Sequence, residues 1–122
     1  IITKKILANE TISVFNNGKM RRDFTFIDDI IFGTKSAIEK NYKCEIFNLG
    51  NNKNEKLMDL ISLLENELSK KAKIKFQPMQ SGDVLETFAD ISKSRKKLNY
   101  NPKISIKEGI PQFINWYRDY FH

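Results

Sequence analysis

Residues 18–30, GKMRRDFTFIDDI, carry the pattern that decides the fold of this chain. They follow a stretch of alternating side chains and a turn-forming Asn-Gly pair, alternate again themselves, and end in two aspartates before an apolar run. Such an order is typical of a strand, a turn, a second strand and a helix. The predicted elements are a strand at 12–15, a turn at 17–18, a strand at 23–27 and a helix over 28–40.

Arg22 stands at the expected start of the second strand. A guanidinium is always charged and offers paired N–H donors at fixed geometry, so it suits a phosphate or a carboxylate. An arginine at such a place more commonly makes a surface ion pair with a nearby carboxylate, which stabilises a protein little. The residue by itself leaves both interpretations open.

The rest of the chain continues an α/β order. Apolar side chains recur at helical spacing in two segments and predict one buried stripe on each: Leu57, Leu60, Ile61, Leu64 and Leu68 on the first, and Ile106, Ile110, Phe113, Ile114, Tyr117 and Phe121 on the second. A capping box, Ser105 to Glu108, opens the last helix, and Asp90 is placed to cap a short one. The further predicted elements are a helix end at 1–9, strands at 44–49 and 73–77, helices at 55–70 and 91–98, and an extended piece at 85–89.

The chain has 122 residues, of which 40% are hydrophobic and 30% charged. These values suit one small domain, residues 1–122, or a piece of one. Because the chain opens on Ile1 within a helix end, we expect a longer parent polypeptide. It has neither an apolar run of about 18 residues nor signal-peptide features, so we expect no membrane segment and a cytoplasmic protein. Cys44, the only cysteine, lies in an apolar run and is expected to be buried.

A net charge of +6 raises the question of nucleic-acid binding. The lysines are spread over the chain, with short basic runs only at 70–73 and 95–97, and no helix-turn-helix, zinc-finger or aromatic RNP-type pattern accompanies them. We therefore expect no nucleic-acid partner and keep a basic nucleic-acid-binding domain as a distant alternative. An anionic small ligand remains compatible with the charge.

No complete catalytic constellation is present in the sequence. The five glycines never form Gly-x-Gly, and no tyrosine is followed four residues later by lysine. The single histidine is the terminal His122, where fraying argues against an ordered role. Asp28 and Asp29 could form an acid/base dyad, but adjacent carboxylates opening an apolar run are more simply a helix N-cap and first-turn charges. No metal site is predicted.

Several segments, in order and spacing, resemble the C-terminal portion of extended short-chain dehydrogenase/reductase enzymes that act on nucleotide sugars. The resemblance covers essentially the whole chain and is strongest to UDP-glucuronate 4-epimerases. The matching segments are 12–20, 22–30, 47–51, 78–84, 89–93 and 116–117.

This resemblance implies a C-terminal substrate-binding lobe with an edge strand of a Rossmann-type parent, whose NAD-binding domain and Tyr-x-x-x-Lys pair lie upstream of this chain. NAD would then be bound by the parent enzyme and not by this segment, which would be inactive alone. It also implies roles for individual residues. Ser13 and Phe15 fall where the family contacts uracil, Arg22 on the arginine that contacts the diphosphate, and Asp83 on the acidic residue at the nucleotide end of the pocket.

Two further positions follow from the same resemblance. Gln80 stands where many relatives carry a second phosphate-binding arginine, so Arg22 should matter more here. Thr87 stands near the sugar, where a small residue leaves more room for a substituent. The expected partners are a UDP-sugar and the N-terminal half of the enzyme; a detached edge strand would also favour a homodimer. A shortened, non-catalytic UDP-sugar-binding module remains the main alternative.

Overall fold

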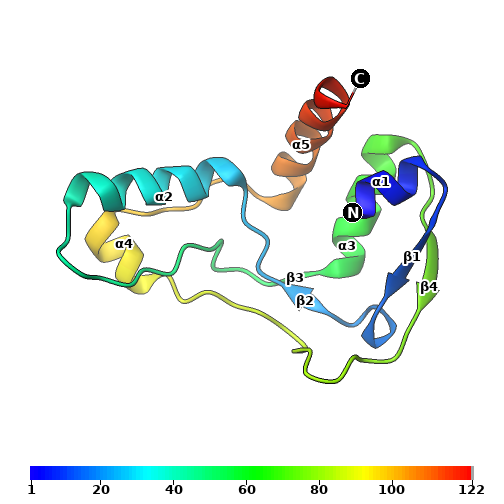
Figure 1. Ribbon diagram of the computed structural model, residues 1–122, viewed down its shortest axis with the longest axis horizontal. Coiled ribbons are helices and arrows are strands. Elements are labelled where there is room, and N and C mark those ends of the chain that lie inside the picture. The colour runs from blue at the N-terminus through cyan, green and yellow to red at the C-terminus, as the bar shows by residue number, and fades with distance from the viewer. Residues whose placement is uncertain (122) are drawn as a thin grey trace.

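The computed structural model describes residues 1–121 as an α/β arrangement of short strands and five α-helices. Figure 1 shows an elongated molecule with α2 and α4 together at one end, α1, α3, β1 and β4 at the other, and β2 and β3 between them. No helix in this range is long and apolar enough to cross a membrane. In chain order the elements are α1 (Ile2–Leu7), β1 (Thr11–Val14), the 3-10 turn η1 (Asn16–Gly18), β2 (Arg21–Arg22), α2 (Ile27–Lys40), β3 (Glu55–Lys56), α3 (Leu57–Leu68), β4 (Lys73–Phe76), α4 (Ser92–Leu98) and α5 (Ile106–Tyr120).

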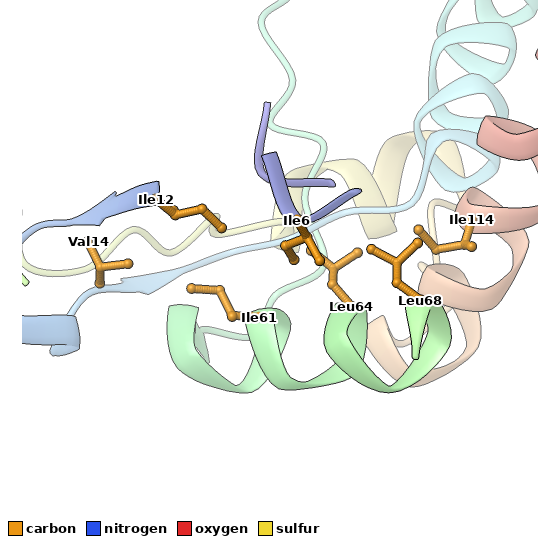
Figure 2. Close-up of a cluster of buried hydrophobic side chains, with 7 residues drawn as sticks. All are labelled: Ile6, Ile12, Val14, Ile61, Leu64, Leu68 and Ile114. Carbon is orange, nitrogen blue, oxygen red and sulfur yellow. The ribbon is translucent and has the colours of Figure 1, made fainter. Parts of the chain in front are cut away.

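The first hydrophobic core lies where α3 packs on the parallel pair of β1 and β4. Figure 2 shows the α3 side chains pointing toward those of α1, β1 and α5; the buried members are Ile6, Ile12, Val14, Ile61, Leu64, Leu68 and Ile114. Ile12 and Val14 alternate with the exposed Thr11 and Ser13, so β1 buries one face only. The stripe predicted on residues 57–68 and the strands predicted at 12–15 and 73–77 are confirmed.

The turn expected at Asn17-Gly18 forms η1, which reverses the chain after β1. Asn16, Asn17 and Gly18 all have positive φ, the region that asparagine and glycine tolerate best. Gln77, just after β4, pins this turn on both sides: its N–H donates to Val14 O at 2.9 Å, and its carbonyl accepts from Asn17 N at 3.0 Å.

The middle of the molecule is a small three-segment sheet around β2. Arg21 and Arg22 pair antiparallel with Lys56 and Glu55 on one side. On the other side Arg21 bonds residues 85–87, with its N–H on Leu85 O at 3.0 Å and its carbonyl accepting from Thr87 N at 3.2 Å. The strand predicted at 23–27 is wrong in position, because backbone pairing ends at Arg22 and α2 already begins at Ile27.

A second core joins α2 and α4. Ile91, Leu98 and Tyr100 are buried there, with Ala37, Phe47, Leu49 and Ala89 packed against them. The predicted helices at 28–40 and 91–98 are confirmed within two residues. The N-cap position of α4 is Ile91 and not the predicted Asp90, although Asp90 Oδ1 accepts from Ser92 N, the first residue of the helix, at 2.9 Å.

Two predictions for residues 44–49 are wrong. The segment forms no strand, because no other segment within residues 1–121 pairs with its backbone. Cys44 is exposed and Ile46 is 83% exposed, whereas only Phe47 and Leu49 reach the second core. A strand needs a neighbour to hydrogen-bond, and an unpaired segment cannot bury both of its faces.

The final helix, α5, begins at the predicted capping box. Ser105 Oγ accepts from Glu108 N, and Glu108 Oε2 accepts from Ser105 N at 3.0 Å, so the two orphan donors are satisfied reciprocally. Its predicted stripe is buried only in part. Ile114 joins the first core with Ile110 and Phe113 beside it, while Phe121 is 61% exposed within an aromatic cluster that includes Trp116 and Tyr120.

Candidate functional site

Four of the six site residues predicted from the sequence line one pocket. Its volume is about 180 Å³, and it opens beside the central sheet. The lining residues are Ser13, Phe15, Met20, Arg22, Phe24, Leu57 and Asp83. These side chains come from β1 and the residue that follows it, from β2 and the residues flanking it, from the start of α3 and from the 80–84 loop.

The pocket combines an apolar wall with one cation. Met20 is buried, while Phe15, Phe24 and Leu57 are half-buried, so they present aromatic and aliphatic surface to the hollow. Ser13 faces it because β1 points Ile12 and Val14 into the core and the intervening residue outward. An apolar wall with aromatic side chains beside a guanidinium can accept a planar ring that carries an anionic group.

Arg22 is fixed by several acceptors at once. Its Nη1 donates to the carbonyls of Arg21 at 2.8 Å and Val84 at 3.0 Å. Its Nη2 donates to Asp83 Oδ1 at 3.0 Å. The carboxylate pairing expected for an exposed arginine is therefore present, and it lies on the wall of the pocket rather than away from it.

Arg21, the preceding residue, faces a different set of partners. Its Nε and Nη2 donate to Asn54 Oδ1 at 3.0 Å and Asn54 O at 2.8 Å, and Asn54 Nδ2 donates in turn to Glu86. Successive side chains of an extended segment point to opposite sides, so one arginine braces the sheet and the next enters the pocket.

Asp23 is a key positioning residue that the sequence analysis did not single out. Its carboxylate accepts from the backbone N–H of Asn51 at 2.7 Å, Asn52 at 3.2 Å and Ala89 at 3.1 Å. It thereby ties three separate segments together directly next to Arg22. The sequence pattern that could have identified Asp23 is the alternation of polar and aromatic residues over 23–26, in which Asp23 and Thr25 share the polar side.

Gly50 allows this close approach. A Cβ there would lie 2.4 Å from Ala89 Cβ and 3.0 Å from Asp23 Oδ2, so any side chain would force the 50–52 and 87–89 segments apart.

The acidic pair Asp28-Asp29 is neither an N-cap nor a dyad in this structure. Phe26 occupies the N-cap position, and both aspartates lie in the first turn of α2. Asp29 is buried and accepts from the backbone of Lys103 at 3.1 Å and Ile104 at 3.0 Å, so it secures the approach to α5. The first-turn position is confirmed, and the N-cap role is wrong.

Tyr100 lies in the second core and holds the backbone of Gly50, next to the segments that Asp23 joins. Its hydroxyl donates to Gly50 O at 2.8 Å inside the second core. Burial raises the pKa of Tyr100 to about 12, with a further contribution from the charges of Asp29 and Asp23. The side chain is therefore a structural hydrogen-bond donor and not an acid/base group at neutral pH.

The other two predicted residues lie outside the pocket lining. Thr87 borders a neighbouring hollow of about 440 Å³ together with Asp23, Thr25 and Gly50, and its Oγ1 accepts from Asp23 N at 3.1 Å. Gln80 is exposed and begins a turn in which Asp83 N donates to Gln80 O, with Gly82 at φ +82°. His122 falls outside the described residues. Within residues 1–121, no three metal-ligating side chains gather into a metal site.

Comparison with known proteins identifies the family of the chain. Residues 1–113 match the family model described as GDP-mannose 4,6 dehydratase. The chain therefore belongs to this family of nucleotide-sugar epimerases and dehydratases.

Individual relatives agree with this assignment. A UDP-glucuronate 4-epimerase of Thermodesulfobacterium geofontis is 42% identical over 117 residues, which is 95% of this chain and 36% of the relative. An uncharacterised protein of Methanocaldococcus jannaschii is 55% identical over 93% of this chain and 35% of its own length. The crystal structure of the Bacillus cereus UDP-glucuronic acid 4-epimerase in complex with UDP-glucuronic acid and NAD superposes with a TM-score of 0.87 at 32% identity, over 98% of this chain and 38% of that one. The chain thus spans little more than a third of the length of these relatives.

Proposed function

We propose that this chain is the UDP-sugar-binding part of an NAD-dependent nucleotide-sugar 4-epimerase that interconverts UDP-glucuronate and UDP-galacturonate. The observation that carries the proposal is the convergence of Ser13, Phe15, Arg22 and Asp83 on one pocket. The Bacillus cereus relative, which binds UDP-glucuronic acid and NAD, supports the choice of ligand.

The chemistry of the pocket suits the UDP portion of such a substrate. The uracil ring would lie against Phe15, Phe24 and Met20, and the diphosphate would accept from Arg22, whose fork matches two phosphate oxygens. Binding energy drawn from this non-reacting portion can hold the substrate while the sugar itself stays free to turn.

In this proposal NAD is bound by a Rossmann domain that lies outside the present chain, and the chain alone is inactive. Residues 1–121 do not fit a dinucleotide, because they contain neither a Gly-x-Gly loop at a helix N-terminus nor a Tyr-x-x-x-Lys pair. The segment 44–49 is largely exposed and has no pairing partner within residues 1–121. This segment and the exposed apolar residues of α2 are compatible with docking to such a domain.

The test is an NMR titration of isotope-labelled chain with UDP, UMP and UDP-glucuronate. Saturable amide shifts are expected around residues 13–22 and 80–87. Arg22→Ala removes a charge-assisted hydrogen bond of about 1.5–3 kcal/mol and should weaken UDP binding by roughly 10- to 100-fold.

The matched control is Arg95→Ala, which removes the same charge from the exposed side of α4 and should leave UDP binding unchanged. Equal losses in both variants, or no shifts at millimolar UDP, would refute the pocket assignment. Incubation of the chain with UDP-glucuronate and NAD should give no UDP-galacturonate. Turnover by this chain alone would refute the proposal that catalysis needs a separate NAD-binding domain.

A further inference from the structure

Asn54 links all three segments of the central sheet, on the face away from the pocket. Its Oδ1 accepts from Arg21 Nε at 3.0 Å, and its backbone carbonyl accepts from Arg21 Nη2 at 2.8 Å. Its Nδ2 donates to Glu86 Oε2 at 3.0 Å. Asn54 directly precedes β3, Arg21 lies in β2, and Glu86 lies opposite Arg21 in the segment on the other side. This bridge therefore crosses β2, whereas the next side chain along the strand, Arg22, points into the pocket.

The guanidinium of Arg22 takes its direction from the segment that the bridge reaches. One of its acceptors is the carbonyl of Arg21. The others belong to the segment 83–87: Asp83 Oδ1 at 3.0 Å, Val84 O at 3.0 Å and Leu85 O at 3.4 Å. A guanidinium has five N–H donors, and within residues 1–121 the Nε proton and one Nη2 proton of Arg22 have no acceptor. Movement of the segment 83–87 would redirect these donors, which are the ones left for a ligand.

Hydrogen bonds, more than packing, position the segment 83–87. Arg21 N donates to Leu85 O at 3.0 Å, Thr87 N donates to Arg21 O at 3.2 Å, and Asp23 N donates to Thr87 Oγ1 at 3.1 Å. The apolar side chains of Val84 and Leu85 are 53% and 52% exposed, so their burial holds the segment weakly. The hydrogen bond from Asn54 to Glu86 therefore carries a substantial share of the positioning, and it acts from beyond β2.

We propose that Asn54 is a positioning residue for the pocket: with Arg21 and Glu86 it holds the segment 83–87 against β2 and thereby directs Arg22 at an anionic ligand. This inference rests on the proposed function and deepens it. Asn54 does not line the pocket, so its effect on binding passes through Arg22. The effect falls on ligands that use the guanidinium, and it disappears in a protein that lacks Arg22.

The test measures the binding of UDP and uridine to the chain and to Asn54→Ala. The variant loses both side-chain hydrogen bonds and should bind UDP about three- to tenfold more weakly. Uridine, which has no phosphate, should lose less than about twofold. In a double-mutant cycle, adding Asn54→Ala to Arg22→Ala should also cost less than about twofold, because the two changes remove the same interaction.

Asn66→Ala is the matched control. It removes an exposed amide from α3, and the side chain of Asn66 has no hydrogen-bond partner within residues 1–121. Both affinities should stay unchanged in this variant.

A pair of reciprocal changes tests the bridge itself. Asn54→Asp keeps an acceptor for Arg21 but sets a carboxylate against Glu86, so it should weaken UDP binding as Asn54→Ala does. Glu86→Gln alone keeps an acceptor oxygen for Asn54 and should change little. The double variant with both changes exchanges the donor and the acceptor of the bridge at unchanged net charge, so it should restore the affinity of the wild type.

The Nε–H resonance of Arg22 gives a readout without ligand. It should shift in Asn54→Ala and Asn54→Asp and return in the double variant. Equal losses for UDP and uridine, an equal loss in the Arg22→Ala background, or a rescue no larger than the effect of Glu86→Gln alone would overturn the proposal, because Asn54 would then act on the fold or the charge in general. Unchanged UDP binding in Asn54→Ala would overturn it as well. If the wild type binds no UDP, the proposed function fails, and the Arg22 resonance still decides whether Asn54 positions that side chain.

Discussion

Two neighbouring arginines, Arg21 and Arg22, show what a single residue contributes to this site. They have the same chemistry, yet Arg21 donates its hydrogen bonds to Asn54 while Arg22 lines the pocket. The difference arises because side chains alternate along β2. In addition, Asp23, the residue after Arg22, is hydrogen-bonded to the backbone of Asn51 and Ala89, which belong to two other segments. Residue type therefore predicted that an arginine could bind an anion here. The register of β2 determines that Arg22, and not Arg21, lies in the pocket.

Gly50 is the residue whose substitution should damage this framework most directly. Gly50→Ala places a Cβ 2.4 Å from Ala89 Cβ and 3.0 Å from an Asp23 oxygen, so backbone must shift. We expect a loss of about 1–3 kcal/mol in the free energy of unfolding, typical of overpacking. The measurement is urea denaturation of the variant and the wild type.

Gly82→Ala serves as the comparison for that experiment. Nothing lies within 4 Å of its added Cβ, and only its φ of +82° is unfavourable for alanine. It should cost about 1–2 kcal/mol, the cost of the left-handed conformation for alanine. A Gly50→Ala variant as stable as the wild type would contradict the close contact between the 50–52 and 87–89 segments.

At the scale of elements, the segment 44–49 is held to α4 by ion pairs, apolar packing and a hydrogen bond from Ser94 Oγ to Asn48 O rather than by strand pairing. Glu45 bonds Lys93 at 2.6 Å and also Lys97, and the two lysines lie over the rings of Phe47 and Tyr42. Two lysines of the basic stretch near residues 93–97 are thus paired internally, which weakens the case for a nucleic-acid surface.

Titration of Glu45 tests this clasp, the pair of ionic contacts from Glu45 to Lys93 and Lys97. Hydrogen bonds from Lys93 and Lys97 lower the pKa of Glu45 from 4.5 to about 2. A depressed carboxyl pKa contributes stability above the unfolded value, and this contribution disappears as the pH falls from about 4.5 through 2. The carboxyl carbon resonance of Glu45 should therefore titrate well below the usual range of a glutamate.

Glu45→Gln should flatten the pH dependence of stability in this acidic window and leave stability at higher pH less dependent on salt. Glu39→Gln, which breaks only an exposed pair with Lys35, is the control and should do neither. An ordinary pKa for Glu45 would mean that the clasp does not persist in solution.

The whole molecule consists of two small cores joined by the central sheet and by the carboxylates of Asp23 and Asp29. Figure 1 shows the helices α2 and α4 of one core and the elements α1, α3, β1 and β4 of the other at opposite ends of the molecule. Several large apolar side chains are exposed on its surface. Among them Ile27, Ile31 and Ile38 recur along one side of α2 and are 60%, 56% and 73% exposed. Surfaces of this kind mark interaction sites.

We therefore expect the isolated chain to self-associate through α2. Sedimentation velocity over increasing protein concentration should show a dimer, and Ile31→Lys should shift the equilibrium toward monomer because a charge would be buried at the contact. Glu39→Gln changes the net charge by the same amount on the same helix and should have little effect. A monomer at all concentrations, or equal effects of the two variants, would contradict this expectation.

The sequence predicted the helices well and the strands unevenly. Helices carry their periodicity and their caps locally, as in the stripe of α3 and the box at Ser105–Glu108, so α2 to α5 lie close to their expected ranges. Strands depend on neighbours. The predicted strands at 12–15 and 73–77 pair in parallel as β1 and β4, whereas residues 44–49 have no pairing partner within residues 1–121 and Cys44 is exposed.

By itself the sequence determined the α/β class, the two apolar stripes, the turn at Asn17-Gly18 and the set of residues from which a binding site could be built. Only the tertiary structure decided which of these meet: Ser13, Phe15, Arg22 and Asp83 share a pocket, while Gln80 and Thr87 lie outside it. It also revealed Asp23, whose partners are 28 and 66 positions away in the chain. Local spacing fixes helices and turns because their hydrogen bonds are local, but a pocket depends on contacts between distant segments, which no local pattern encodes.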